Sequence, residues 1–402
     1  MSEANLATAQ PGGGAYGRPR QHQNRLLTEI GPGTPCGEFM RRYWHPVGIS
    51  AGATARPKKV RILGEDLVLF RDRTGRAGLL YPRCMHRGTT LYYGKVEERG
   101  IRCCYHGWLF DVEGNCLEQP CEPEGGLHRD LARQPWYPVE ERYGLVFAYL
   151  GPPAKKPVLP RYDIFEELAP GEKIRVQMGG WGATRDDSFE VLPYSWLHMN
   201  DNIMDPFHVW VLHTTFSQVQ FVADFAPKPV VDFFQAEHGV FYSAYRDLDD
   251  GRAVDRISSF LLPSIMSVPN TQLLDGRATN IGWLVPVDET SHIQVLAGKT
   301  RESGPRLPAL TNGKSWGEMS EAERQDVPND FEAQAGQGPV SRHSEEHLAQ
   351  SDRGVAMQRR LLEQQIRIVA EGGDPLGVAF DPAQALVRIR SGNFFRNKAA
   401  AE

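Results

Sequence analysis

The chain has 402 residues, of which 41% are hydrophobic and 24% are charged, so it can bury a large core in about two domains. Its formal net charge of −5 excludes a general attraction to nucleic acid or to acidic lipid. We find no apolar run long enough to span a bilayer and expect no signal peptide, because the first residues lack its charged and apolar regions. The six cysteines are therefore expected to be thiols or metal ligands in a cytoplasmic protein.

The first part of the chain is predicted to be a β module that follows a mobile arm. Residues 1–24 are rich in Gly, Gln and Pro and are expected to form the arm. In residues 25–155, short alternating runs such as KVRILGEDLVLF are divided by hairpin signals, which favours an all-β domain. Four prolines in ten residues at 151–160 then indicate a linker.

The second part, residues 156–402, alternates strand-like runs with helical segments. Apolar residues at helical spacing predict a helix in the stretch 353–373, which ends in two glycines. Residues 301–328 are rich in Pro, Gly and Ser and are expected to form an inserted loop. Together the two parts predict an α+β protein in which an all-β domain precedes an antiparallel sheet flanked by helices.

Two Cys-His pairs offer four metal ligands. Cys84 and His86 are spaced C-x-H, and Cys103 and His106 are spaced C-x-x-H, so two facing hairpin tips could hold one group. A structural zinc ion is one reading, although zinc sites usually pair Cys with Cys and His with His. One Cys and one His on each loop suit a [2Fe–2S] cluster in which one iron takes both thiolates and the other takes both imidazoles. The spacing favours the cluster.

The stretches CMHRGTTL and CCYHGWLFDVEGN resemble the Rieske domain of aromatic-ring oxygenases. The resemblance implies that residues 25–155 hold a Rieske [2Fe–2S] cluster. Cys104 stands where that family usually has proline, and we interpret it as a packed thiol. Trp108 follows the last ligand pair and would shield the site from water.

A second group of candidate ligands lies in DNIMDPFHVWVLH, where His208 and His213 are five residues apart. On a regular α-helix, residues at this spacing point roughly 140° away from each other. They could share an iron ion only where the helix widens, as in a π-bulge, or where one of them ends the helix. The alternative is an ordinary helix with Asp205 as its N-cap and Pro206 at its first position. The spacing alone leaves both readings open.

The same segment resembles the N-x-x-D-x-x-H-x4-H signature of Rieske non-haem iron oxygenases. The resemblance implies that His208 and His213 bind a mononuclear Fe(II) ion. It also implies that Asp205 is a bridge, whose carboxylate accepts one hydrogen bond from His208 and another from His106 of a neighbouring subunit. The first residue of the signature is Asn202.

The third iron ligand is expected from NDFEAQAGQGPVSRHSEEHLAQSDR, residues 329–353. This stretch resembles the C-terminal signature of the phthalate-dioxygenase-like branch of the family. Aligning Gly338-Pro339 and Glu346-His347-Leu348 places the carboxylate ligand at Asp330. Glu332 is two residues away and remains a chemical alternative.

Other histidines are expected to be structural. His343 and His347 are four apart and would share a helix face, but HSEEH lacks the H-E-x-x-H pattern of a zinc protease. His45 is expected to pack in the core. His198 could approach the substrate pocket, but a structural role is favoured.

The resemblance implies a terminal oxygenase component that activates O2 at Fe(II) with electrons from its Rieske cluster. NADH electrons would arrive through a separate reductase, because the chain has no Gly-rich dinucleotide fingerprint. The expected substrate is a substituted aromatic acid or a methoxyarene, oxidised by ring hydroxylation or O-demethylation. The expected assembly is a head-to-tail homotrimer.

Two other readings remain: a Rieske electron carrier or redox sensor without oxygenase activity, and a zinc-stabilised scaffold. For the oxygenase, the pocket is expected between the 178–200 region and the strands within 215–300. The aromatic and sulfur-containing residues of this part suit either a flat apolar substrate or a core: Trp196, Met199, Phe207 and Trp210.

Overall fold

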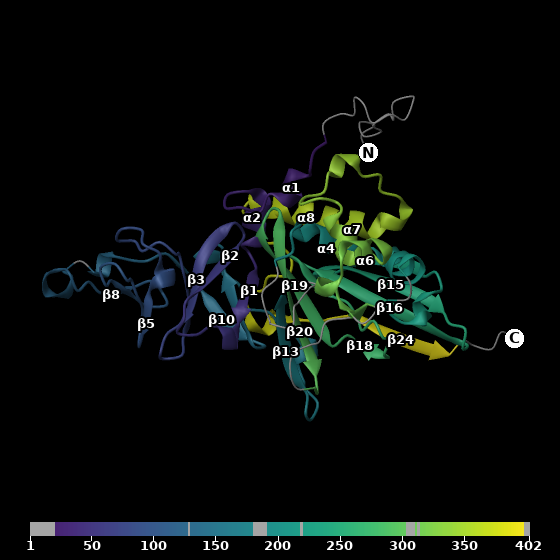
Figure 1. Ribbon diagram of the computed structural model, residues 1–402, viewed down its shortest axis with the longest axis horizontal. Helices are drawn as coiled ribbons and strands as arrows, with labels where there is room; N and C mark the ends of the chain where they lie inside the picture. The colour runs from purple at the N-terminus through teal and green to yellow at the C-terminus, as the bar shows by residue number, and fades with distance from the viewer. Residues whose placement is uncertain are drawn as a thin grey trace.

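The computed structural model describes residues 21–127, 129–179, 191–217, 220–302, 310–311 and 314–397. The described chain forms a narrow lobe and a broad lobe (Figure 1). Most of the predicted arm lies outside the described residues, as do parts of the predicted loop 301–328. Within the described ranges, no helix combines the length and the apolar character needed to cross a membrane.

The narrow lobe consists of small antiparallel sheets. One sheet has the order β2 (Lys58–Ile62), β3 (Glu65–Arg71), β4 (Ala77–Leu80) and β9 (Trp136–Tyr137). A second has the order β5 (Lys95–Glu97), β6 (Gly100–Arg102), β7 (Leu109–Phe110) and β8 (Cys116–Glu118). A third, β1 (Trp44–Ile49), β11 (Leu145–Tyr149) and β10 (Val139–Arg142), lies next to the broad lobe.

The broad lobe is built on a nine-stranded antiparallel sheet. Its strands follow in space as β13 (Lys173–Gly179), β20 (Ser291–Thr300), β19 (Asn280–Asp288), β17 (Ile265–Ser267), β16 (Arg252–Leu261), β15 (Gly239–Asp247) and β14 (Val230–Ala236). β24 (Gly392–Asn397) pairs with both β16 and β18 (Gly276–Arg277). Two short pairs complete the strands: β12 (Arg161–Tyr162) with β23 (Leu386–Val387), and β21 (Leu310–Thr311) with β22 (Lys314–Ser315).

Helices cover the sheet of the broad lobe. α4 (Trp196–Ile203) contacts β16 and β19, and α8 (Arg353–Ala370) contacts β14 and β15. α7 (Asp330–Ala335) contacts α4. α5 (Pro206–Trp210) follows α4 in the chain. Figure 1 shows α4, α7 and α8 grouped on one side of the sheet. The remaining helices are short: α1 (Arg25–Thr28), α2 (Pro35–Met40), α3 (Asp163–Glu166) and α6 (Glu321–Asp326).

The two lobes share backbone hydrogen bonds and one core. The turn between β2 and β3 reaches the end of β19, where Leu63 N–H donates to Pro286 O and Gly64 N–H to Val287 O, each at 2.9 Å. The main hydrophobic cluster contains side chains of both lobes, such as Phe147. The lobes are therefore packed against each other.

The predicted α+β class is confirmed, and α8 confirms the helix predicted in 353–373. The prediction of a continuous loop at 301–328 is wrong for its second half. α6 forms there because the Ser320 side chain accepts from Glu323 N–H, while the Glu323 carboxylate accepts from Ser320 N–H. This capping box satisfies backbone donors that would otherwise be free at the start of the helix.

Candidate metal centres

The spacing of His208 and His213 is accommodated by a widened turn. α5 begins at Pro206 with Asp205 as its N-cap, and a π-helix follows it over Val211–Phe216. A π turn contains more residues than an α turn, so residues five apart can lie on one side. Both readings of the sequence are thus combined: the helix starts at Asp205-Pro206 as in an ordinary helix, and it widens before His213.

Hydroxyl groups satisfy the backbone at the point where the helix widens. The carbonyl oxygen of Trp210 accepts hydrogen bonds from Thr214 Oγ1 and from Thr215 Oγ1, the latter at 2.9 Å. The two hydroxyl groups thus satisfy the carbonyl at the point where the α-helix ends and the π-helix begins. The wide turn is therefore supported by side chains from its own six residues.

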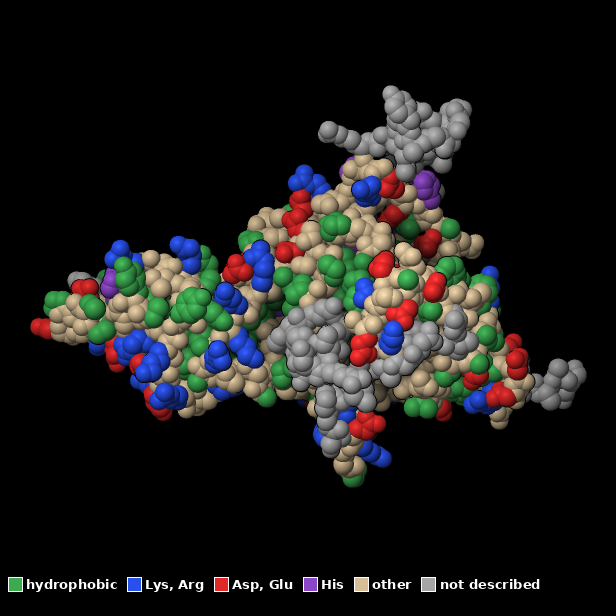
Figure 2. Space-filling model, in the orientation of Figure 1, with side chains coloured by type: hydrophobic (Ala, Val, Ile, Leu, Met, Phe, Trp, Pro, Cys, Tyr) green, Lys and Arg blue, Asp and Glu red, His purple; other side chains and the backbone are tan. Residues whose placement is uncertain are grey.

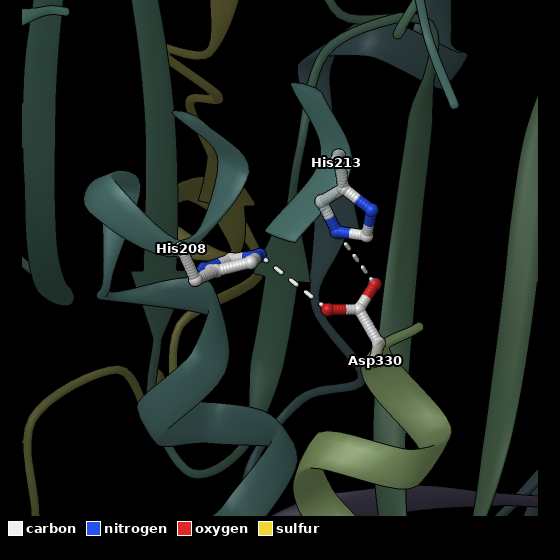
Figure 3. A group of neighbouring side chains, drawn as sticks. All are labelled: His208, His213 and Asp330. Atoms are coloured by element: carbon white, nitrogen blue, oxygen red, sulfur yellow. Dashed lines mark ion pairs between the residues drawn. The ribbon is translucent and has the colours of Figure 1, made fainter. Parts of the chain in front are cut away.

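His208, His213 and Asp330 converge, with one possible ligand atom from each lying within 4.8 Å of the others (Figure 3). Asp330 is the first residue of α7, and its two carboxylate oxygens face different imidazoles. The Oδ1–Nε2 distance to His208 is 3.5 Å, and the Oδ2–Nε2 distance to His213 is 3.2 Å. Two imidazoles and one carboxylate are the donor set of non-haem Fe(II) sites with open positions. The residues present fit such an ion.

The charges of this group are strongly coupled. Burial would raise the pKa of Asp330, but the hydrogen bond and charge of His213 and the charge of His208 outweigh it and lower that pKa to about 2. Conversely, burial would lower the pKa of His213, but its contacts with Asp330 raise it. The metal-free group therefore favours a proton between the two side chains, which a metal ion would replace.

Neighbouring amides hold the three candidate ligands. Asn202 Nδ2 donates to Asp330 Oδ1 at 2.9 Å. Gln220, which no sequence pattern indicates, accepts from His213 Nδ1. The alternative ligand Glu332 is occupied elsewhere, since its carboxylate accepts from Trp316 Nε1 at 2.6 Å and from Asn329 N–H at 3.0 Å. Glu332 caps α7, and Asp330 is the carboxylate that meets the histidines.

Asp205 differs from the expectation in one contact. His208 Nδ1 hydrogen-bonds to the backbone carbonyl oxygen of Asp205, whereas Asp205 Oδ2 is 4.0 Å from that nitrogen. Asp205 Oδ1 instead accepts from the backbone N–H groups of Phe207 and His208, because it caps α5. The Asp205 side chain is still 30% exposed, so an outside group can reach it.

The two cysteine loops of the narrow lobe have matching backbones. In each loop the cysteine N–H donates to the carbonyl of the residue five positions later, at 2.9 Å in both. The glycine four positions after the cysteine returns a bond to the cysteine carbonyl, from Gly88 to Cys84 at 2.7 Å and from Gly107 to Cys103 at 3.1 Å. Both glycines have positive φ, 76° and 71°, which a residue with a Cβ adopts only with strain.

The four candidate cluster ligands meet at the tips of these loops. The thiols of Cys84 and Cys103 are buried, whereas the imidazoles of His86 and His106 are partly exposed, with ring centroids 4.6 Å apart. Burial raises the pKa of Cys84 to about 11, and burial and the nearby His106 lower that of His86. Two buried thiols and two partly exposed imidazoles at the loop tips fit a Rieske cluster.

Other residues near these loops correct or support the sequence predictions. Trp108 stacks on His86, with ring centroids 4.5 Å apart and planes at 3°, and so covers one ligand as expected. The prediction that Cys104 is packed is wrong, because its side chain is exposed at the loop tip. Cys103, the neighbouring thiol, is the one turned inward.

The remaining histidines stay outside the metal groups found among the described residues. His45 is buried and its Nε2 bonds to Met40 O, as expected for a packed residue. His198 is also buried, and its ring packs edge-on against Tyr194. The prediction of a shared helix face for His343 and His347 is wrong, since only a three-residue 3₁₀ helix forms, over His343–Glu345.

These two centres define a protein with a Rieske-type module and a separate 2-His-1-carboxylate site, and comparisons with known proteins agree. Residues 44–138 match the family model of the Rieske [2Fe-2S] domain. The phenoxybenzoate dioxygenase subunit alpha of Ectopseudomonas oleovorans is 59% identical, over 97% of this chain and 96% of that protein. The 5,5'-dehydrodivanillate O-demethylase oxygenase subunit of a Sphingobium species is 35% identical, over 90% and 84%.

The chain belongs to the Rieske non-haem iron aromatic-ring oxygenases, as an alpha (oxygenase) subunit. It is thus the terminal oxygenase component, which uses a Rieske cluster and a mononuclear iron ion and needs a separate electron-transfer partner. Solved structures share the fold. The caffeine complex of a mutant of NdmA from Pseudomonas putida CBB5 covers 84% of this chain and 94% of its own, with a TM-score of 0.62 and 19% identity.

Proposed function

We propose that this subunit oxidises an aromatic acid that carries an ether or methoxy substituent, by ring hydroxylation or by O-demethylation. Its relatives support this substrate class, since one is named for phenoxybenzoate and another for O-demethylation of dehydrodivanillate. The observation that carries the proposal is the convergence of His208, His213 and Asp330 in a chain that also has two facing Cys-His loops. An electron carrier would need only the loops.

The matching backbones of the two cysteine loops support the assignment of the cluster ligands, and the convergence of two histidines and one aspartate supports that of the iron ligands. The cluster ligands are Cys84, His86, Cys103 and His106. The iron ligands are His208, His213 and Asp330. We place the arm at residues 1–24, the Rieske domain at 25–155 and the catalytic domain at 156–402.

The protein side chains position the reaction rather than supply its oxidising power. A bound Fe(II) ion would supply oxygen activation at its open positions. Asn202 orients the Asp330 carboxylate by donating to Oδ1, so the other oxygen faces His213. Asp205 fixes His208 through its backbone carbonyl and keeps an exposed carboxylate for a partner group.

A head-to-tail homotrimer would join the two centres. The loop sheet β5–β8 lies at the far end of the narrow lobe, whereas α4 and α7 lie in the broad lobe (Figure 1). Within one chain the centres are thus in different lobes, which supports delivery from the His106 of one protomer to the Asp205 of the next. Heterologous contacts of this kind close into rings.

The electrons are proposed to come from NADH through a separate reductase, in the cytoplasm. Figure 2 shows Lys and Arg side chains spread over the narrow lobe, a surface that suits an acidic redox partner. None of the six cysteines forms a disulfide in the described structure, which is in keeping with a reducing compartment.

Asp205→Asn tests the proposal. Asparagine also caps helices, so α5 and both metal centres should be retained while the charged bridge is lost. With reductase, NADH and phenoxybenzoate, the expected result is a normal Rieske EPR signal, full iron content and turnover lowered at least about 100-fold, more than loss of a cap would cause. Unchanged turnover would remove Asp205 from electron delivery. A wild-type enzyme that consumes O2 at the same rate with and without aromatic acids would refute the proposed substrate class.

A further inference from the structure

Two arginines are buried in the catalytic sheet without acidic partners. Arg246 on β15 and Arg256 on β16 are 2% and 3% exposed. In the part of the chain that the structure describes, neither guanidinium forms an ion pair with a carboxylate. Buried arginines are rare unless their charge is paired, so this pair requires an explanation.

The two guanidinium groups are only partly satisfied. Arg256 donates from Nη1 to Asn393 Oδ1 at 2.9 Å and from both Nη atoms to backbone carbonyls of 269–270, which leaves its Nε without a partner. Arg246 donates from Nε to Pro227 O at 3.2 Å, and its Nη1 has no hydrogen-bond partner among the described residues. Arg256 therefore has a structural role already, while Arg246 has donors to spare.

A buried hydroxyl joins the pair. Ser258 lies two residues from Arg256 on β16 and faces the same side of the sheet, because side chains alternate along a strand. It is fully buried, and its Oγ has no partner in the described structure. Native proteins leave few buried polar atoms unpaired, and several on one face indicate a missing water, ion or ligand.

The electrostatics favour an anion at this place. Burial lowers the pKa of Arg246 and that of Arg256 to about 10 each, against an opposing effect of the neighbouring Tyr242 on both, and the charge of Arg256 lowers the pKa of Arg246 further. Two like charges held in a low dielectric repel each other and lack the solvation of water. A carboxylate between them would offset both penalties and could form charge-assisted hydrogen bonds.

Aromatic rings connect this place to the candidate iron site. Both guanidinium carbons lie 5.2 Å from the ring centroid of Phe225. Phe225 packs against Phe221 with centroids 5.6 Å apart, and Phe221 packs against the ring of His213 at 4.4 Å. The arginine pair therefore lies two aromatic side chains from the candidate iron ligand His213.

The register places the pair on the helix-covered face. Arg246 is opposite Val254 across the β15–β16 pair, and Val254 shares a buried cluster with Val209 of α5. The pair therefore faces the same interior as the helix that carries His208.

We propose that Arg246, supported by Arg256, binds the carboxylate of the aromatic acid substrate and thereby sets which part of the molecule reaches the iron. This inference rests on the proposed function.

The test compares an acid with its neutral analogue. Binding of phenoxybenzoate and of phenoxybenzamide to the iron-loaded holoenzyme, with its cluster oxidised, is measured by titration calorimetry. Wild-type protein should bind the acid more tightly than the amide. Arg246→Met should raise the Kd of the acid about 10- to 100-fold and that of the amide less than about threefold, because only the acid loses a charge-assisted bond. Arg246→Lys should restore part of the acid binding.

Two controls separate this effect from misfolding and from loss of any arginine. Arg252→Met removes an arginine from the same strand whose side chain is 44% exposed and pairs with Asp250, so it should leave both Kd values unchanged. Iron content and the Rieske EPR signal report whether each variant is folded. Arg246 forms only one hydrogen bond to the backbone in the described structure, so its variants should retain the iron and the EPR signal.

Two results would overturn the inference: wild-type protein that binds the acid no better than the amide, or an Arg246→Met variant that weakens both ligands equally. Neither result bears on the oxygenase activity. That activity is judged separately, from O2 consumption driven by aromatic substrates.

Discussion

The imidazole Nδ1 of His213 lies 2.6 Å from the side-chain oxygen Oε1 of Gln220. The same glutamine donates from Nε2 to the backbone oxygen of Pro328 at 3.2 Å, two residues before Asp330. Its first bond keeps the proton on Nδ1, so that Nε2 of His213 can face a metal ion. Together the two bonds tie His213 of the π-helix to the segment that carries the candidate carboxylate ligand. Gln220 is therefore a positioning residue for two of the three candidate ligands.

Gln220→Ala should weaken iron binding about 10- to 100-fold, because the partners of metal-bound histidines contribute to affinity at this level. Gln220→Glu should lose less, since it keeps an acceptor for Nδ1 but gives up the bond to Pro328. The measurement is iron retention against a graded chelator, with the Rieske signal as an internal standard.

Ser217→Ala is the matched control for this prediction. Ser217 Oγ donates to the same Pro328 oxygen, at 2.5 Å, but forms no hydrogen bond with the His213 side chain in the described structure. Equal loss of iron in Ser217→Ala and Gln220→Ala would show that the Pro328 segment, rather than the orientation of His213, controls affinity.

Arg359 of α8 bridges two carboxylates that are mostly buried. Its Nη2 is 2.6 Å from Asp201 Oδ2 and 3.0 Å from Glu346 Oε1. Arg359→Met should lower the free energy of unfolding by about 3 kcal/mol, because it leaves two partly buried charges without a partner. Urea unfolding measures the change. Arg367→Met, on the same helix but 64% exposed, should cost less than about 0.5 kcal/mol.

Adjacent thiols should behave in opposite ways. Cys103→Ser should abolish the Rieske EPR signal, since a hydroxyl is a poor replacement for a thiolate ligand of iron. Cys104→Ser should keep the signal and the activity, because Cys104 is exposed while Cys103 is buried beside Cys84. Loss of the signal in Cys104→Ser alone would exchange the two assignments.

His45 should make the fold sensitive to acid. Burial lowers its pKa to about 4, against a bond to Met40 that raises it. In the unfolded chain His45 is protonated below pH about 6.5, whereas in the native protein it is protonated only below about pH 4. The free energy of unfolding therefore falls as the pH is lowered through this window. Between pH 7 and pH 5, wild-type protein should lose about 2 kcal/mol more than His45→Gln.

Urea midpoints at the two pH values measure this difference, with exposed His347→Gln as the control. The same pH dependence in His45→Gln and wild-type protein would assign the acid sensitivity to other groups.

The sequence could indicate the candidate ligands because metal chemistry restricts both residue type and spacing. Cys84 to His86 and Cys103 to His106 required only short loops, and the loops fold as two similar turns. Asp330 depended on alignment with a family signature. The structure supports that choice over Glu332, because Glu332 is used to cap its helix.

Other features depended on contacts that no spacing rule describes. A glutamine can reach a histidine from many positions, so nothing in the sequence distinguished Gln220. Arg246 and Arg256 alternate with other residues as surface arginines on a strand would, and only the packing of the sheet reveals that they are buried. For Cys104, the direction of the side chain within a four-residue tip decided the outcome.

The widened turn after α5 contains its own support, since Thr214 and Thr215 both donate to Trp210 O. One short, continuous peptide thus contains both the two histidines at five-residue spacing and the hydrogen bonds that support their geometry. Protein designers could transfer such a segment into an unrelated helical scaffold. With a carboxylate placed opposite, it would supply the two histidine ligands of an iron site.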